Sequence, residues 1–337
     1  MKIFISAIFS LVLMAKSCKS DSSAEPGETV LGVDASLFLS DAISVTLVDC
    51  ILSDGSSAEC YQIVSNGLAS DHEMGPWCPT TITDDATAGG IWLENGNVYD
   101  VDGEFVKNMA TFYNDNTWKM YDADGKIYKT ETLEDCNNAA NPNVGAEYAN
   151  FCVECLPSYI SNINQTYLIP KTPKLTSETT LFGAAGGPPD GGAGGPPPGG
   201  DMGGGPPPDA IGGLSARGIA FNGIPFDAPA PTDAILGAYT LAPFDDAGGH
   251  INLNAGYHYH AAMGKTTKFN QPDGHAAMIG YAMDGHGIYE QLNEDGTEPT
   301  DLDECRGHTD TTRGYHYHVS SPGTNNFFNC LKGAYVN

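Results

Sequence analysis

Short runs of apolar and β-branched residues, separated by turn residues, dominate the chain after its first 30 positions. Residues 43–50 (ISVTLVDC) are one such run, and residues 117–121 and 126–130 flank an Asp-Ala-Asp-Gly turn that is typical of a hairpin. One stretch, residues 144–159, has apolar spacing compatible with a short helix. The pattern predicts a mainly β protein, either all-β or α+β with few short helices.

A different apolar pattern stands at the N-terminus, where residues 3–15 (IFISAIFSLVLMA) form a continuous apolar run flanked by lysines. The run is too short to span a bilayer and is typical of a secretory signal peptide. We therefore predict a signal peptide over residues 1–17, a flexible tether over residues 18–30, and export to the cell envelope or secretion. Two processing routes remain open, namely lipid attachment to Cys18, as in bacterial lipoproteins, and plain cleavage before it.

Composition divides the rest of the chain into three parts. Residues 183–213 consist almost entirely of Gly, Pro, Ala and Asp, so they lack the apolar surface needed to form ordered structure and are predicted to be a disordered insertion. Residues 31–182 form a β-rich N-terminal part before this insertion. Residues 214–337 follow it and contain a duplication.

The duplicated part is organised around the sequence Gly-Tyr-His-Tyr-His, which begins at Gly256 and again at Gly314, 58 positions later. A Gly-His pair precedes each copy at the same distance, so both share the frame G-H-x5-G-Y-H-Y-H. The repeat extends upstream, because residues 218–223 and 280–285 share the pattern G-x-A-x-[N/D]-G. We therefore predict two pseudo-symmetric halves that pack about a two-fold axis, since each leaves an apolar face that the other can cover.

Three histidines occupy the same relative positions in each copy. Alternate side chains of a strand face the same side, about 6.6 Å apart, so the two histidines of each Tyr-His-Tyr-His point together while the tyrosines point away. A third ligand from a nearby loop would complete a three-histidine site with an open position for a divalent transition metal, copper or zinc. The predicted ligands are His250, His258 and His260 in the first copy and His308, His316 and His318 in the second.

Other arrangements of these residues remain open. The histidines of both halves can form one shared or dinuclear centre, or the strands can be structural, with ordinary hydrogen bonds. Acidic pairs that begin at Asp245 and Asp303 are interpreted as acceptors for the outer ring N–H groups or as direct ligands. His275, in a Pro-Asp-Gly-His segment between the copies, is either a further ligand or a hydrogen-bonded loop histidine.

The cysteines predict a disulfide framework. The chain has nine, and setting Cys18 aside leaves eight, an even number that is typical of an oxidising compartment. Cys50 is predicted to pair with Cys60 across a short turn, and Cys305 with Cys330 in the C-terminal third. Three pairings are open for the other four, of which the last two form a CxxC that we interpret as two half-cystines with other partners. These four are Cys78, Cys136, Cys152 and Cys155.

The formal net charge of −27, from 42 acidic against 15 basic residues, makes nucleic acid and anionic lipid poor partners. Membrane contact is therefore expected only through a lipid on Cys18. The sequence contains no Gly-x-Ser-x-Gly elbow, phosphate-binding loop or His-Glu-x-x-His helix. Nucleophilic hydrolysis has no support.

The repeated motifs resemble those of the YHYH-domain family, a group of exported proteins named for this tetrapeptide. Upstream, residues 65–79 (SNGLASDHEMGPWCP) are similar to the family's SNG...H..G.FP element, and residues 165–170 to its strand that ends in proline. The resemblance implies a domain from about residue 60 to Asn337 and makes His72 a further candidate ligand. His286 and the glycine after it depart from the family pattern, which has an aromatic residue and a proline there. The family brings no established reaction.

Two functions are consistent with the sequence. The first is an exported, lipid-anchored protein that binds copper or zinc, either for metal handling or as a metalloenzyme that uses the open position to activate water or oxygen. The alternative is a cell-surface interaction or glycan-binding module, whose Tyr-His strands are structural or line an aromatic face. Its partner would be an extracellular small molecule or polymer.

Overall fold

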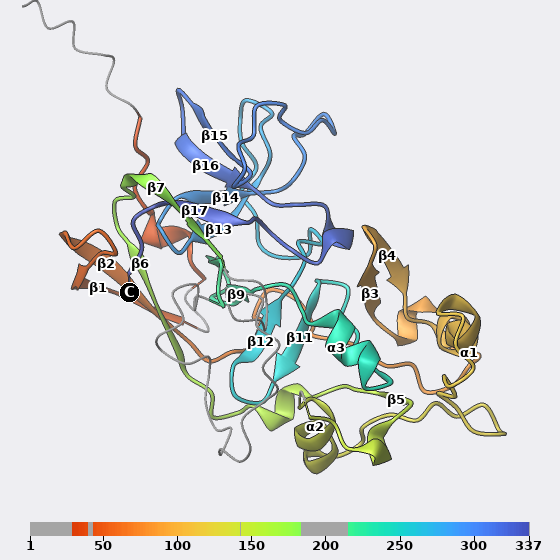
Figure 1. Ribbon diagram of the computed structural model, residues 1–337. Helices are drawn as coiled ribbons and strands as arrows, with labels where there is room; N and C mark the ends of the chain where they lie inside the picture. Colours follow the sequence, from red (N-terminus) through yellow and green to blue (C-terminus); the bar gives the residue numbers. More distant parts are fainter. Residues whose placement is uncertain (1–28, 40–42, 142, 183–214, 337) are drawn as a thin grey trace, which may run out of the picture.

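The largest unit of the fold is an eight-stranded sheet that comes entirely from the duplicated part of the chain (Figure 1). The structure is a computed structural model that describes residues 29–39, 43–141, 143–182 and 215–336. The strands lie in the order β11-β12-β9-β8-β13-β14-β16-β15. Their bounds are β8 Gly218–Ala220, β9 Pro225–Phe226, β11 Gly249–Asn252, β12 Gly256–Tyr259, β13 Met278–Ala282, β14 Gly287–Tyr289, β15 Gly307–Asp310 and β16 Gly314–His318.

The two sequence copies contribute corresponding strands to this sheet. Read inward from one edge, the first copy supplies β11, β12, β9 and β8, and from the other edge the second supplies β15, β16, β14 and β13. Each copy has an antiparallel edge hairpin followed by a parallel pair, and β8 joins β13 antiparallel between them. The strand order thus follows the sequence repeat, while the two-fold relation of the halves in space stays a prediction.

Smaller elements surround this sheet. Strands β1, β2 and β6 form a three-stranded antiparallel sheet, and β3–β4, β5–β10 and β7–β17 form pairs. Three short α-helices and five single-turn 3-10 helices complete the described residues, so the predicted mainly β class with few short helices is confirmed. The strand bounds are β1 Ile43–Ile51, β2 Ser57–Ser65, β3 Ile91–Glu94, β4 Asn97–Asp100, β5 Phe151–Cys152, β6 Gln165–Pro170, β7 Leu175–Leu181, β10 Thr240–Leu241 and β17 Cys330–Gly333. The helices are α1 Gly103–Phe112, α2 Leu133–Ala139 and α3 Thr232–Gly237, with 3-10 turns at Ala35–Leu37, Ala86–Ala88, Ala146–Tyr148, Pro157–Tyr159 and Pro322–Thr324.

The two longer helices begin at side-chain caps, and the predicted helix over residues 144–159 is wrong. Asp102 accepts from the N–H of Phe105 at the start of α1, and Thr132 forms a capping box at the start of α2. Residues 144–159 instead contain two 3-10 turns around β5, which pairs in parallel with β10. The strand pairing between Cys152 and Leu241 therefore outweighs the weak helical periodicity of the apolar residues in this segment.

The core joins the N-terminal part to the duplicated part. One hydrophobic cluster contains Ile63 and Ile169 of the β1-β2-β6 sheet together with Tyr257 and Tyr317 of the repeats. A second cluster packs Trp92 and other residues of the N-terminal part against the segment before β11. The domain boundaries drawn from the sequence stay predictions. The signal peptide, most of the tether and the Gly/Pro-rich insertion lie outside the described residues.

Four disulfides tie the described elements together. The predicted pairs Cys50–Cys60 and Cys305–Cys330 are confirmed. The members of the CxxC have separate partners, as interpreted from the sequence, and the remaining bonds are Cys78–Cys152 and Cys136–Cys155. Such a set of disulfides indicates an oxidising compartment. None of the helices in the described part of the chain has the length and apolar character needed to cross a membrane.

Candidate metal centres

Each edge of the eight-stranded sheet carries a hairpin with two histidines directly opposite each other. In β11–β12 the pair is His250 and His258, and in β15–β16 it is His308 and His316. Directly opposed side chains project from the same face with Cβ atoms about 4.5–5.5 Å apart. The second histidine of each Tyr-His-Tyr-His lies two positions further on and therefore joins the same face. The strand register thus gathers the three histidines of each copy.

The first copy forms a three-histidine cluster of His250, His258 and His260. One ring nitrogen of each lies within 4.8 Å of the others, and the Nε2 atoms of His250 and His260 are 3.1 Å apart. The buried ring of Phe244 packs against the imidazoles of His250 and His260, with centroids 5.0 and 5.3 Å away. An apolar ring therefore covers part of this cluster.

The second copy forms a four-histidine cluster of His275, His308, His316 and His318, whose ligand atoms lie within 4.8 Å of one another. The Nε2 of His316 is 2.9 Å from that of His308 and 3.0 Å from that of His275. The Nε2 of His318 is 3.2 Å from that of His275. Four nitrogens at 2.0–2.1 Å from a tetrahedral zinc ion would be roughly 3.3 Å apart, so these three Nε2 pairs already have nearly the required spacing.

In six of the seven cluster histidines, the outer ring nitrogen faces an oxygen that can only accept a hydrogen bond. The Nδ1-to-oxygen distances are 3.1 Å for His258 to Gly256, 2.6 Å for His260 to Ala228, 3.1 Å for His275 to Ala276, 2.8 Å for His308 to Asp301, 2.9 Å for His316 to Gly314 and 2.8 Å for His318 to Glu290. Nδ1 of these six rings must then carry the proton, which leaves a lone pair on the Nε2 of each of them. These lone pairs converge at close range and repel each other unless a cation lies between them. Metal-binding histidines have this same outer hydrogen bond.

Burial favours the neutral form of five of the seven cluster imidazoles, which is the form that binds a metal ion. Desolvation lowers the pKa of His260, His316 and His318 to about 3, and the neighbouring histidines of each cluster add to this decrease. Burial also lowers the pKa of His250 and His275. At neutral pH these rings do not lose metal-binding capacity to protonation.

The metal-free protein is expected to lose stability as the pH falls below about 6.5, because these histidines charge more readily when unfolded. Between about 6.5 and about 3 the unfolded chain binds protons that the buried rings of His260, His316 and His318 exclude, so lower pH favours unfolding. Each such ring can contribute up to about 1.4 kcal/mol per pH unit. Urea denaturation of chelated protein from pH 7 to pH 5 measures this slope, and the variant His316→Gln/His318→Gln should flatten it. A slope unchanged by that variant would contradict the expectation.

The histidines of the two copies do not meet in one shared centre, and two details of the prediction need correction. The hairpins lie at opposite edges of the sheet, with β12 and β16 separated by five strand spacings, roughly 24 Å. His250 and His308 come from strands β11 and β15 and not from loops, because the Gly-His segment itself pairs with the Tyr-His-Tyr-His strand. His275 does come from a loop, and it completes the second cluster.

The other two histidines singled out in the sequence lie outside both clusters. His72 packs beside Tyr257 and Tyr259, which point to the opposite face of β12, and its Nδ1 is 2.8 Å from Asp71. His286 contacts the backbone oxygen of Tyr315 through Nδ1, and its buried Nε2 has no hydrogen-bond partner among the described residues. Neither His72 nor His286 is therefore placed to bind the same ion as the cluster histidines.

The acidic pairs have a different role from the one predicted. Asp245 accepts from the hydroxyl of Tyr257 and Asp303 from that of Tyr315, each at 2.9 Å, so both support the tyrosine face of their hairpin. Within the described residues, the carboxylate that contacts a cluster histidine is that of Asp301, which accepts from Nδ1 of His308. Sequence reasoning missed it because it has no counterpart of the same chemistry in the first copy, where Pro243 stands 58 positions earlier.

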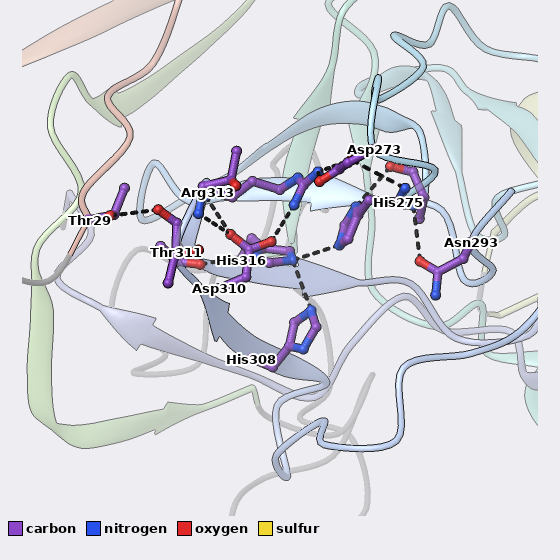
Figure 2. A network of polar contacts seen from close by, with 12 residues as sticks. Thr29, Asp273, His275, Asn293, His308, Asp310, Thr311, Arg313 and His316 are labelled. Carbon is purple, nitrogen blue, oxygen red and sulfur yellow. Dashed lines mark hydrogen bonds and ion pairs between the residues drawn. The ribbon is translucent and has the colours of Figure 1, made fainter.

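A buried arginine positions the loop that carries His275, as Figure 2 shows. The side chain of Arg313 is 4% exposed and pairs with Asp310 on its own hairpin and with Asp273 on the loop. Asn293 accepts from the N–H of Ala276 at 3.1 Å and holds the loop on its other side. These contacts fix a loop segment against β16, although 41 positions separate the two histidines that meet there, 275 and 316.

The fold and these sites define a class, a disulfide-bonded, mainly β protein with two buried histidine clusters that could hold metal ions. Residues 207–301 match the family model described as YHYH protein, so the chain carries a domain of the YHYH family. The matched span contains the whole three-histidine cluster and His275. No curated protein and no solved structure matches the chain.

Proposed function

We propose that this protein is an exported metal-binding protein that holds two transition-metal ions, zinc or copper, with one ion in each histidine cluster. The observation that carries the proposal is the convergence of ring nitrogens in both clusters, with the Nδ1–H of six of the seven rings directed outward to an oxygen. Packing alone gives no reason to aim several lone pairs at one point inside a protein. A cation removes the repulsion and explains why the rings are held there.

The number of bound ions tests this proposal. Protein without an affinity tag is refolded oxidatively after treatment with a chelator, reconstituted with zinc or copper, dialysed and measured by elemental analysis. We expect about two ions per chain, and about one in each of the double variants His258→Ala/His260→Ala and His316→Ala/His318→Ala. The variant His72→Asn serves as the control and should retain both ions. Wild-type protein that keeps no appreciable metal after reconstitution would refute the proposal.

The alternative of an aromatic recognition face finds no support in the geometry. All four tyrosines of the repeats are buried, with exposed fractions of 0–9%. Their hydroxyls bond to inner polar groups, for example that of Tyr317 to Asp284 at 2.6 Å and that of Tyr259 to Asn222 at 2.7 Å. A glycan or polymer cannot stack on rings in these positions.

Export and lipid anchoring belong to the same proposal. The four disulfides favour an oxidising compartment, and the N-terminal sequence up to Cys18 has the pattern of a cleaved signal. The mass of the mature protein tests the anchor, because a diacylglyceryl cysteine at its N-terminus is heavier than the unmodified chain. A mature chain with an unmodified N-terminus would instead support plain secretion.

A further inference from the structure

We propose that the two clusters have different tasks. The four-histidine cluster holds a closed, structural ion, and the three-histidine cluster presents an open metal position to a pocket that takes a small, neutral, mainly apolar organic molecule with one metal-coordinating atom. This inference rests on the proposed metal binding and assigns a ligand class to one of the two sites.

The number of ligands distinguishes the clusters. Structural zinc sites have four protein ligands in a tetrahedron, whereas sites that bind exogenous molecules have three and leave one position open. His275 supplies the fourth ligand of the second cluster, and the Arg313–Asp273 pair fixes its loop. The first cluster groups three histidines only, within the described residues. An ion held there has a coordination position that no residue of the described cluster fills.

The open position faces a cavity. A pocket of about 560 Å³ is lined by His250, His258 and His260 and by none of the four histidines of the other cluster. This volume is within the range of pockets that bury small organic ligands. Phe244 covers the imidazoles of His250 and His260, so the cavity is the side from which a ligand can reach the ion.

The lining of the cavity indicates the kind of molecule that fits. Most of the side chains beyond the histidines are apolar, and they include Trp77, Val144, Val153, Ala234, Ile235 and Ile251. Such a wall favours an apolar body, because burial of apolar surface contributes about 25 cal/mol per Å².

The charges of the lining disfavour an anionic ligand body. The cavity wall contains the carboxylates of Asp227 and Glu154 and no lysine or arginine. Lys129 pairs with Glu154 at 2.8 Å, and Arg217 interacts electrostatically with Asp227, so the cationic partners of both carboxylates lie outside the lining of the cavity. A phosphate or polycarboxylate would meet no cationic side chain there. The metal ion therefore supplies the polar anchor, and the rest of the ligand is neutral.

Imidazole probes of increasing size test this inference on the full chain loaded with cobalt(II), whose visible spectrum reports its ligands. We expect 4-phenylimidazole to change the spectrum and to bind about tenfold or more tightly than imidazole, because the phenyl group enters the apolar cavity. An imidazole that carries a benzoate in place of the phenyl group should bind more weakly than 4-phenylimidazole. Cobalt content is measured before and after each titration, so that extraction of the ion is not taken for binding.

Histidine variants of each cluster show which cluster gives the spectral response to the imidazole probes. His316→Ala/His318→Ala should respond as the wild type does, whereas His258→Ala/His260→Ala should not respond. The exposed position Ala234 on α3 allows Ala234→Trp to narrow the cavity, which should remove the advantage of the phenyl group. Cobalt uptake without any response to the probes, or a response that survives in His258→Ala/His260→Ala, overturns this inference and leaves the proposed metal binding intact. A chain that takes up no cobalt, zinc or copper overturns both.

Discussion

Removal of the metal from the four-histidine cluster is expected to lower the free energy of unfolding by about 4 kcal/mol when free metal stands at about a thousand times its dissociation constant. The ligands of this cluster come from β15, β16 and a separate loop, so only the folded chain brings them together. An ion that binds the folded state and not the unfolded state stabilises the fold through mass action. Guanidinium denaturation with disulfides intact, in buffered zinc and in excess chelator, measures the difference.

Two variants separate ligand loss from a general loss of stability. His275→Ala removes a direct ligand, so the metal-dependent part of the stability should fall by at least about 2 kcal/mol, since loss of an outer hydrogen-bond partner alone weakens metal binding 10–100-fold. Lys171→Gln breaks an exposed ion pair with Glu59 and should leave the metal-dependent part unchanged. Equal denaturation midpoints with zinc and with chelator in the wild type would contradict the expectation.

The sequence repeat was sufficient to predict six of the seven clustered histidines. Alternation along a strand places the two histidines of each Tyr-His-Tyr-His on one face whatever the surrounding fold. The duplication then argues that both copies form similar groups. Two disulfides were predictable for a comparable reason, because Cys50 and Cys60 flank one short turn and few cysteines lie near Cys305 and Cys330.

The remaining features of the sites and of the disulfide framework depend on contacts between distant parts of the chain, which no local pattern reveals. His275 is a single residue in a turn-like segment, and its place in the cluster depends on an ion pair between Asp273 and Arg313, 40 positions later. The pairing of the Gly-His segments as strands was also hidden, since four residues with at most one apolar side chain give no period. Sequence alone left all arrangements of Cys78, Cys136, Cys152 and Cys155 open.

Loss of the Cys78–Cys152 disulfide is expected to be the most damaging single change outside the clusters. The bond closes a segment of 74 residues, for which the loop-entropy relation gives about 4 kcal/mol, against about 3 kcal/mol for Cys50–Cys60 with a separation of 10. Its two ends also support the three-histidine cluster. Trp77, next to Cys78, donates from Nε1 to the backbone oxygen of Gly249 in β11 at 3.0 Å.

The other end of this disulfide carries part of the cavity wall, because Val153 follows Cys152 directly and lines the pocket. Cys78→Ser/Cys152→Ser should therefore lower the free energy of unfolding by about 4 kcal/mol and weaken metal binding at the three-histidine cluster, while the four-histidine cluster keeps its affinity. Cys50→Ser/Cys60→Ser is the matched control, since it removes a disulfide of the β1–β2 hairpin, which carries no cluster histidine. Denaturation curves and zinc titrations of both variants provide the comparison. If both variants lost the same ion with the same affinity change, the disulfide would act on global stability alone and not on the cluster.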